Sequence, residues 1–207
     1  MDAVEALERA YAACRAQLLT LEGISGETAR PVFGEGPLHP AAMLIGEAPG
    51  AEETEAGRPF VGRAGKNLER FLESVSLSRK ALFVTNAVKY RPFRVGKSGR
   101  KANRSPLRSE LEQGRALLLR EIALVEPELI VTLGNSPLWA LTGKSAIGTL
   151  HGRLIDCPME SGARELFPLY HPASLMYNPS LEEAYQRDME TLAALLAQRF
   201  SGANPLF

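Results

Sequence analysis

The chain has 207 residues, enough for one well-formed core, so we expect a single domain over residues 1–207. Apolar residues make up 45% and charged residues 23%, as in ordinary soluble globular proteins, and the 24 Lys and Arg balance the 24 Asp and Glu. Two cysteines exclude a disulfide framework and a cysteine-rich metal site, and the apolar runs are too short to cross a membrane.

Helical and strand-like patterns alternate along the chain. Apolar residues three and four apart predict an amphipathic helix over residues 2–19, which a connection rich in Gly and Pro follows over 20–40. Further helices are predicted just after Gly62, over 110–125 and over 181–200. Short apolar runs predict four strands, at residues 43–45, 81–88, 129–133 and 166–170.

Three segments are less regular. Residues 89–108 hold eight Lys and Arg residues, no Asp or Glu, and interrupting Gly and Pro, which predicts an exposed basic loop. Residues 135–164 suggest a short helix, a turn and a small strand at 153–155. Pro168, inside the last strand, predicts an edge position or a bulge because it lacks an N–H group.

Strands separated by helices predict an α/β fold, a three-layer αβα sandwich with a central four-stranded, mainly parallel sheet. The carboxyl ends of parallel strands then share one edge, where open α/β folds bind ligands. Three predicted strands finish at that edge with a polar side chain, namely Glu47, Asn86 and His171. This shared position is the first indication of a functional site.

Each of these residues has an ordinary structural explanation when taken alone. Glu47 can cap a turn, Asn86 can close one, Phe60 can be a core residue, and His171 can be a satisfied strand-end histidine. The basic segment can be a solvated surface. Together, however, they offer a ring for stacking, an amide that reads a heterocycle edge, an imidazole donor and phosphate-binding cations. That set suits a base turned out of nucleic acid.

Four blocks of sequence make this interpretation specific. They are Gly46-Glu47-Ala48-Pro49-Gly50 with the following 57–65, then 84–92, 126–134 and His171-Pro172-Ala173-Ser174-Leu175. In this order they resemble the motifs of family-4 uracil-DNA glycosylases, and the resemblance extends from about residue 12 to residue 199. It implies a monofunctional glycosylase of base-excision repair that hydrolyses the N-glycosidic bond of uracil in single- or double-stranded DNA.

The resemblance also implies roles for individual residues. Phe60 would stack on the extruded uracil, and Asn86 would bind the uracil edge and discriminate against cytosine. His171 would lie at O2 and stabilise the departing anion, while Glu47 would lie on the sugar side. Ala48 stands where the better-studied glycosylases have Asp, so the orientation of water falls to Glu47 or, as second candidate, to Glu53.

Further contacts follow from the same motifs. Gly46, Ala48 and Asn103 are assigned to the substrate site. The expected DNA contacts are Arg63, Lys89, Arg91, Arg104, Ser174 and Leu175. Leu175 or Met176 would insert into the duplex, as apolar side chains do where base steps are unstacked.

The chain departs from the family at the cysteines. Family-4 enzymes hold an iron–sulfur cluster with four Cys ligands, but here Cys14 stands where the family has a pair and Tyr90 replaces a third. No thiol lies near Gln113, and Cys157 is outside the pattern. We therefore expect no cluster and no metal, with packing that involves Tyr11, Tyr90 and Leu117 in its place.

The sequence is also compatible with other functions. One is a glycosylase for another deaminated base such as hypoxanthine, and another is a catalytically weak DNA-binding module of the same fold. A binding protein for small nucleotides is disfavoured because Gly46 to Gly50 supplies no GxGxxG turn. A related subgroup that traps uracil-DNA covalently has a basic loop ending in a His. The loop of this chain contains no His, so the resemblance does not imply covalent trapping. The first residues lack the pattern of a signal peptide, so we expect a cytoplasmic protein, by default a monomer, with no membrane partner.

Overall fold

The structure is a computed structural model that describes residues 2–18, 30–159 and 162–199. Several sequence predictions extend beyond these ranges. Residue 19 of the first predicted helix, residues 20–29 of the connection and residue 200 of the last helix lie outside the described residues.

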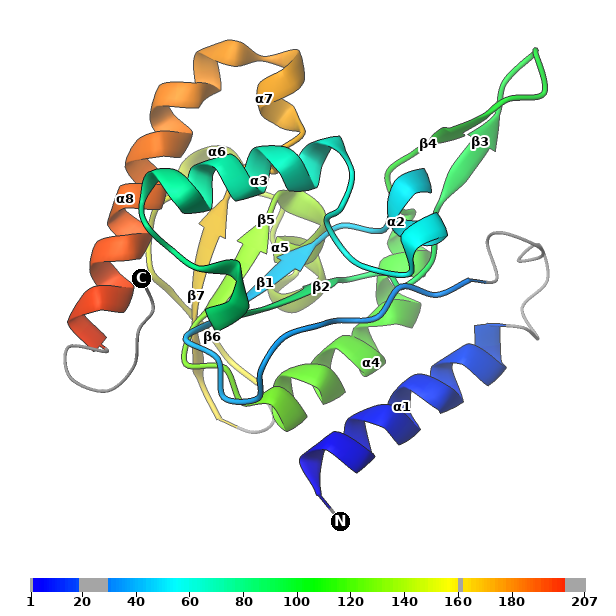
Figure 1. The fold of residues 1–207 in the computed structure, drawn as a ribbon, viewed down its shortest axis with the longest axis horizontal. Coiled ribbons are helices and arrows are strands. Elements are labelled where there is room, and N and C mark those ends of the chain that lie inside the picture. Colours follow the sequence, from blue (N-terminus) through cyan, green and yellow to red (C-terminus); the bar gives the residue numbers. More distant parts are fainter. Residues whose placement is uncertain (1, 19–29, 160–161, 200–207) are drawn as a thin grey trace.

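A five-stranded sheet in the order β2-β1-β5-β7-β6 forms the centre of the molecule (Figure 1). Its strands are β1 (Ala42–Gly46), β2 (Leu82–Asn86), β5 (Ile130–Leu133), β6 (Ile155–Cys157) and β7 (Arg164–Leu169). Strands β1, β2, β5 and β7 run parallel, as predicted, and β6 is antiparallel to β7. The predicted count of four is therefore one short, because the small strand expected near residue 155 joins the same sheet.

Helices cover both faces of the sheet. The α-helices are α1 (Ala3–Leu18), α2 (Ala51–Ala56), α3 (Arg63–Ser74), α4 (Arg108–Val125), α5 (Asn135–Thr142), α6 (Ile147–Leu150), α7 (Ser174–Tyr177) and α8 (Glu182–Arg199). Two 3₁₀ turns, η2 (Arg79–Ala81) and η3 (Pro179–Leu181), precede β2 and α8. None of the described helices is long and apolar enough to cross a membrane.

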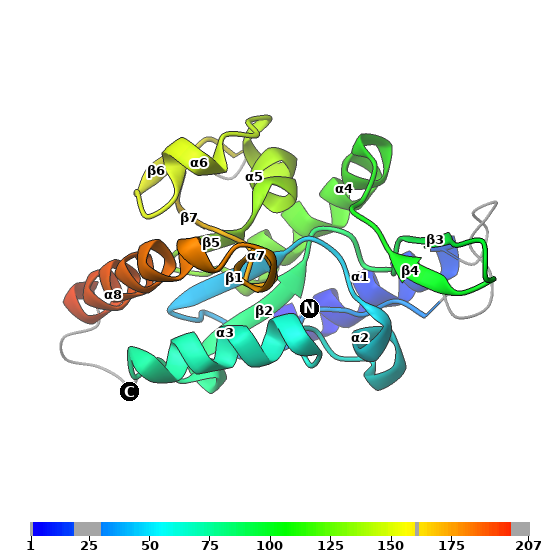
Figure 2. The same ribbon diagram turned by 90° about the horizontal axis from the view of Figure 1, so that it is seen from above.

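Side-chain alternation in the strands divides the core into two clusters. In β1, Leu44 packs in the cluster that includes residues of α3 and α8, while Met43 and Ile45 pack in the cluster that includes residues of α1, α4 and α5. Figure 2 shows α3 on one side of the sheet and α4 on the other. The fold is thus a three-layer αβα arrangement, and β1 is buried on both faces.

Pro168 fits within β7 because the pairing of β7 with β6 ends before it. β7 lies between β5 and β6, so it is not an edge strand, and that part of the prediction is wrong. However, the pairing with β6 stops at Leu166, and Pro168 lies two residues beyond it. The carbonyl of Pro168 accepts a hydrogen bond from the N–H of Gly152 (2.9 Å) outside the ladder.

The basic segment is more ordered than the predicted loop. It forms an antiparallel hairpin of β3 (Phe93–Val95) and β4 (Lys101–Asn103) that projects from the body of the protein (Figure 1). A Gly turn connects the two strands, and the ammonium of Lys101 lies 4.8 Å from the centre of the Phe93 ring. The hairpin presents most of its basic side chains to solvent.

Candidate active site

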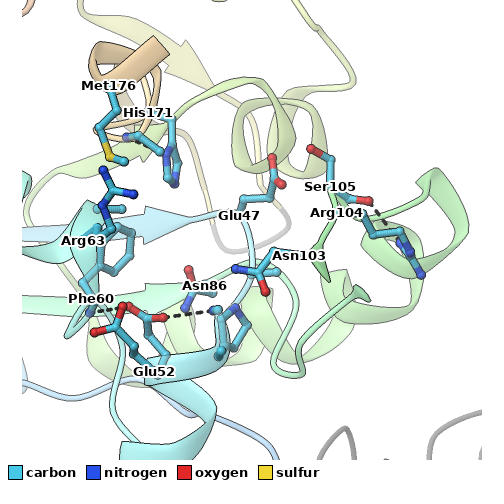
Figure 3. Close-up of a pocket in the computed structure, with 18 of the residues that line it drawn as sticks. Glu47, Glu52, Phe60, Arg63, Asn86, Asn103, Arg104, Ser105, His171 and Met176 are labelled. Atoms are coloured by element: carbon cyan, nitrogen blue, oxygen red, sulfur yellow. Dashed lines mark hydrogen bonds between the residues drawn. The ribbon is translucent and has the colours of Figure 1, made fainter. Parts of the chain in front are cut away.

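Two loops at the carboxyl ends of β1 and β2 are held side by side. Gly46 pairs with Asn86 at the end of the parallel ladder. Beyond it, the N–H of Ala87 donates to the Gly46 carbonyl (2.9 Å) and the N–H of Val88 donates to the Glu47 carbonyl (3.1 Å). Backbone hydrogen bonds therefore fix Glu47 relative to Asn86, and Figure 3 shows both beside the same hollow.

Gly46 contributes by having no side chain. A Cβ atom at this position would collide with the amide oxygen of Asn86 and with the ring of Phe60. These two groups therefore converge over the glycine backbone, which explains why the predicted substrate residue Gly46 does not itself line the cavity.

Phe60 has a strained backbone that its neighbours support. Its φ of 54° lies in the left-handed region, which is unfavourable for an aromatic residue. The guanidinium of Arg79 donates to the carbonyls of Pro59 (2.7 Å) and Phe60 (3.3 Å). Gly65 lets α3 approach, because a Cβ there would collide with the Phe60 backbone. The ring lies 6.2 Å from that of His171, centre to centre.

The two candidate glutamates differ in their contacts. Glu53, on α2, accepts hydrogen bonds from the N–H groups of Gly62 (2.7 Å, to Oε1) and Gly50 (3.1 Å, to Oε2). It thereby joins the two halves of the first motif, with one backbone donor on each oxygen. Glu47 accepts a hydrogen bond from the Ser136 hydroxyl (2.7 Å, to Oε2), which comes from the first turn of α5.

His171 is held in one tautomer. Its Nδ1 accepts a hydrogen bond from the N–H of Ala173 (3.1 Å), so the proton of the neutral ring is on Nε2. Burial lowers the pKa of His171 below its ordinary value, and the negative charges of Glu47 and Glu53 only partly oppose that shift. Gly134 has a φ of 94°, and a Cβ atom there would come within 3.1 Å of the Cβ of His171. The site therefore offers a neutral imidazole donor.

These groups surround a cavity of about 460 Å³ (Figure 3). The sequence-predicted residues that line it are Glu47, Ala48, Glu53, Phe60, Arg63, Asn86, Asn103, Arg104, His171 and Met176. Asn103 and Arg104 reach it from the end of the basic hairpin. The structure thus brings together residues from three of the four motif blocks and from the end of the basic hairpin.

The structure corrects two of the expected DNA contacts. Lys89 is 3% exposed and forms an ion pair with the buried Glu121, so it cannot reach a phosphate. Leu175 is 6% exposed and packs in the core cluster that includes α8 residues, so it cannot insert into a duplex. Arg91 and Ser174 do not line the cavity, although Arg91 donates to the side-chain oxygen of Asn103 (2.7 Å).

Several polar and aromatic residues of this site were not predicted from the sequence. Ser105 and Tyr177 line the cavity, and Ser136 binds Glu47. Tyr177 is 85% exposed, two positions after the buried Leu175 and beside Met176, which also lines the cavity. The motif that begins at His171 indicates that a nearby side chain inserts into DNA, but the sequence does not show which residue of the short α7 faces outward.

The cysteines do not form a cluster site. Cys14 shares a hollow of about 400 Å³ with Tyr90, Gln113 and Gly114, and it is the one cysteine among the residues that line this hollow. The Sγ of Cys157 lies on β6, 3.8 Å from the Leu141 carbonyl oxygen. Within the described part of the chain, no group of three or more His, Cys, Asp or Glu could hold a metal ion. The residues therefore do not fit a cluster that needs four thiolates.

A family model and several sequence relatives indicate one family. The family model described as "Uracil DNA glycosylase superfamily" matches residues 33–195. A type-4 uracil-DNA glycosylase of Pyrobaculum aerophilum is 37% identical over 76% of this chain and 79% of that protein. A second type-4 uracil-DNA glycosylase, from Thermotoga maritima, is 36% identical over 73% of this chain and 74% of that protein. The crystal structure of Pedobacter heparinus SMUG2 has the same fold, with a TM-score of 0.54 at 11% identity over 78% of this chain and 77% of that one.

The environment of His171 predicts its titration. We expect a pKa below the ordinary 6.5 and a neutral ring with its proton on Nε2. Because the unfolded chain then binds more protons than the folded one, the histidine's contribution lowers the free energy of unfolding as pH falls below 6.5. Nitrogen-15 NMR of the histidine rings measures both properties, with His171→Gln to assign the signal. A pKa above 6.5, or a proton on Nδ1, would contradict this account.

Proposed function

The chain belongs to the uracil-DNA glycosylase superfamily, and we propose that it hydrolyses the N-glycosidic bond of uracil in DNA as the first step of base-excision repair. One observation carries the proposal. Phe60, Asn86, His171 and Glu47 line a single cavity, with the types of group that an extruded uracil needs. The similarity to type-4 uracil-DNA glycosylases over most of the chain supports uracil as the substrate.

Base recognition rests on Phe60 and Asn86. The Phe60 ring offers a face on which the planar base stacks, and the Asn86 amide lies next to it above Gly46. An amide accepts a hydrogen bond from N3–H of uracil and donates one to O4. Cytosine has an acceptor at N3 and a donor at C4, so its hydrogen-bonding pattern is reversed. The buried amide therefore disfavours cytosine by leaving polar groups unpaired.

Departure of the base requires a donor at the oxygen that gains charge. His171 supplies a neutral Nε2–H because the Ala173 backbone fixes the tautomer and burial keeps the ring unprotonated. A preorganised donor of this kind stabilises the developing uracil anion without reorganisation during the reaction. His171 thus acts as an electrostatic stabiliser of the leaving group.

Glu47 acts on the sugar side of the bond. The hydroxyl of Ser136 binds one oxygen of the carboxylate and orients it. The carboxylate then stabilises the oxocarbenium-like sugar and positions the attacking water. Each oxygen of Glu53 instead accepts a backbone N–H group, so its role is to hold the Gly50 and Gly62 loops together. This difference favours Glu47 over Glu53, in a motif where Ala48 offers no carboxylate.

The DNA contacts surround the cavity. Arg104 lines it, but its guanidinium is paired with Glu110 (2.6 and 2.8 Å). Arg63 also lines it, and the exposed basic hairpin of β3 and β4 extends from the same side. Such cations bind phosphates and position the strand without reading its sequence. Tyr177, exposed at the cavity rim, replaces Leu175 as the side chain that fills the space of the extruded base.

The protein performs this reaction without an iron–sulfur cluster. The whole chain has two cysteines, and a cluster held only by cysteines needs four. At the position of one family ligand, the Tyr90 hydroxyl instead donates to Oε1 of Glu110 (3.1 Å). We assign no metal or cofactor to any step of the reaction.

Release of free uracil tests the proposed function. We expect the unmodified protein to release uracil from single-lesion DNA, and Asn86→Ala to be about a hundredfold slower because the amide no longer stabilises the bound base. Chromatography of the released base measures the rate. A parallel substrate with hypoxanthine distinguishes the alternative, since release of hypoxanthine but not uracil would change the assignment. DNA binding with no base release would leave only a binding module.

The position of Tyr177 predicts a difference between DNA substrates. Tyr177→Ala should lower kcat/KM about tenfold on double-stranded DNA and less than about twofold on single-stranded DNA, because only the duplex resists unstacking. Tyr177→Phe, which keeps the ring, serves as the matched control and should behave like the unmodified protein. Equal losses on both substrates would argue against insertion into the duplex.

The visible absorbance and the iron content of the purified protein test whether a cluster is present. Protein purified without oxygen should show no broad visible absorbance and far less than one iron atom per chain, since too few thiolates are present. The variant Cys14→Ser with Cys157→Ser should release uracil at an unchanged rate. Stoichiometric iron that the double substitution removes would overturn the proposal.

A further inference from the structure

A buried polar network lies directly beneath the base-recognition residue and has no part in the reaction described above. At its centre are Lys89 and Glu121, whose side chains are 2% and 0% exposed. Tyr11 on α1 and Thr85 on β2 complete it. Fully buried charges of this kind are rare, and they need a physical explanation.

The ammonium of Lys89 makes a complete set of contacts. It donates to the backbone carbonyl of Asn86 (2.6 Å), to the Thr85 hydroxyl (2.7 Å) and to the Glu121 carboxylate. An ammonium has three N–H donors, so all of them are used. One of these three bonds therefore holds the backbone of the residue that reads the base.

The geometry of β2 explains why this carbonyl needs such a partner. β2 is one of the two edge strands of the sheet, and alternate residues direct their backbone groups to the same side. Val84 pairs on the outer side with Glu35, through hydrogen bonds of 3.0 and 2.8 Å. Asn86, two residues later, directs its carbonyl to that side beyond the end of the pairing. Lys89 supplies the donor that a neighbouring strand would otherwise provide.

Glu121 connects this contact to the helices. Its Oε1 accepts a hydrogen bond from the Tyr11 hydroxyl (2.7 Å), and both oxygens lie 3.3 Å from the Thr85 hydroxyl. Burial lowers the pKa of Lys89, and the charge of Glu121 opposes that shift. The carboxylate therefore favours the ammonium form that donates to Asn86.

Stability alone does not account for the pair. Desolvation of two charges often exceeds their mutual attraction, and apolar replacements of similar volume are frequently neutral or stabilising. What the ion pair adds here is a fixed donor against the Asn86 carbonyl.

We propose that Lys89 and Glu121 are positioning residues that fix Asn86 for recognition of uracil. This inference rests on the proposed function, because it assigns the network a part in that same site. A small displacement of a recognition group can reduce a rate about a hundredfold, so the network should affect catalysis without touching the substrate.

The test replaces both charges together. The variant Lys89→Met with Glu121→Leu replaces both charged side chains by apolar ones of similar volume, so it leaves no unpaired charge. It should fold cooperatively and release uracil from single-stranded DNA with a kcat about ten to a hundred times lower. The KM for DNA, which the phosphate contacts dominate, should change less than about threefold. Inhibition by free uracil should weaken by a factor similar to the loss in kcat.

A matched control separates positioning from general destabilisation. Met189→Ala removes a buried side chain from α8, in the core cluster on the opposite face of the sheet, and should leave kcat unchanged. If the double variant does not fold, Glu121→Gln keeps the shape of the side chain but removes its charge. It should lower kcat about threefold to tenfold. A folded variant with unchanged kcat and unchanged inhibition by uracil would overturn the inference, as would an equal loss in Met189→Ala.

A second readout does not depend on catalysis. The side-chain amide of Asn86, identified in NMR spectra by its loss in Asn86→Ala, should shift or broaden in the double variant or in Glu121→Gln. An unchanged signal would overturn the positioning role. If the unmodified protein releases no uracil, the proposed function fails, and this measurement still decides whether the network holds Asn86.

Discussion

The parallel pairing of β1 with β2 is the constraint on which the site depends. Because Gly46 and Asn86 are partners in this ladder, the two loops that follow begin side by side. The absence of a side chain at Gly46 then lets the Asn86 amide and the Phe60 ring meet over the backbone. Glu47 follows at once on the same loop. A backbone register, set by burial of both strands, therefore determines the distance between base recognition and the sugar side.

The strain at Phe60 is offset by contacts from distant parts of the chain. A positive φ at an aromatic residue costs about 1 to 3 kcal/mol, so it persists only where the surroundings enforce it. Arg79 binds the carbonyls of Pro59 and Phe60, Gly65 lets α3 pack on that backbone, and Glu53 ties Gly62 to Gly50. The aromatic platform is thus rigid before DNA binds. Preorganisation of this kind lowers the entropic cost of base capture.

Residues next to strand ends were predictable, whereas the direction of side chains in loops was not. Short apolar runs located β1, β2, β5 and β7, and their polar ends located Glu47, Asn86 and His171, because parallel topology brings carboxyl ends together. The prediction that Lys89 contacts DNA was wrong because a run of basic residues looks the same in the sequence whether all of them are exposed or one of them is buried. Its burial depends on Glu121, which is 32 residues away in sequence. Leu175 and Tyr177 differ in exposure only because of how one turn of helix packs on the core.

Hydrogen bonds to Glu110 hold together the segments around Tyr90, Arg104 and the start of α4. Glu110 accepts hydrogen bonds from Tyr90 (3.1 Å), from Arg104 (2.6 and 2.8 Å) and from the N–H of Leu107 (2.6 Å) at the start of α4. Arg104 and the adjacent hydrogen bonds hold the pKa of Glu110 below its usual value despite burial, so the carboxylate stays charged at neutral pH. This clamp fixes the segment that carries Asn103 and Ser105 to the cavity. Together with Tyr11 and Glu121 beneath Asn86, it ties α1, α4 and the basic hairpin to the site through polar contacts.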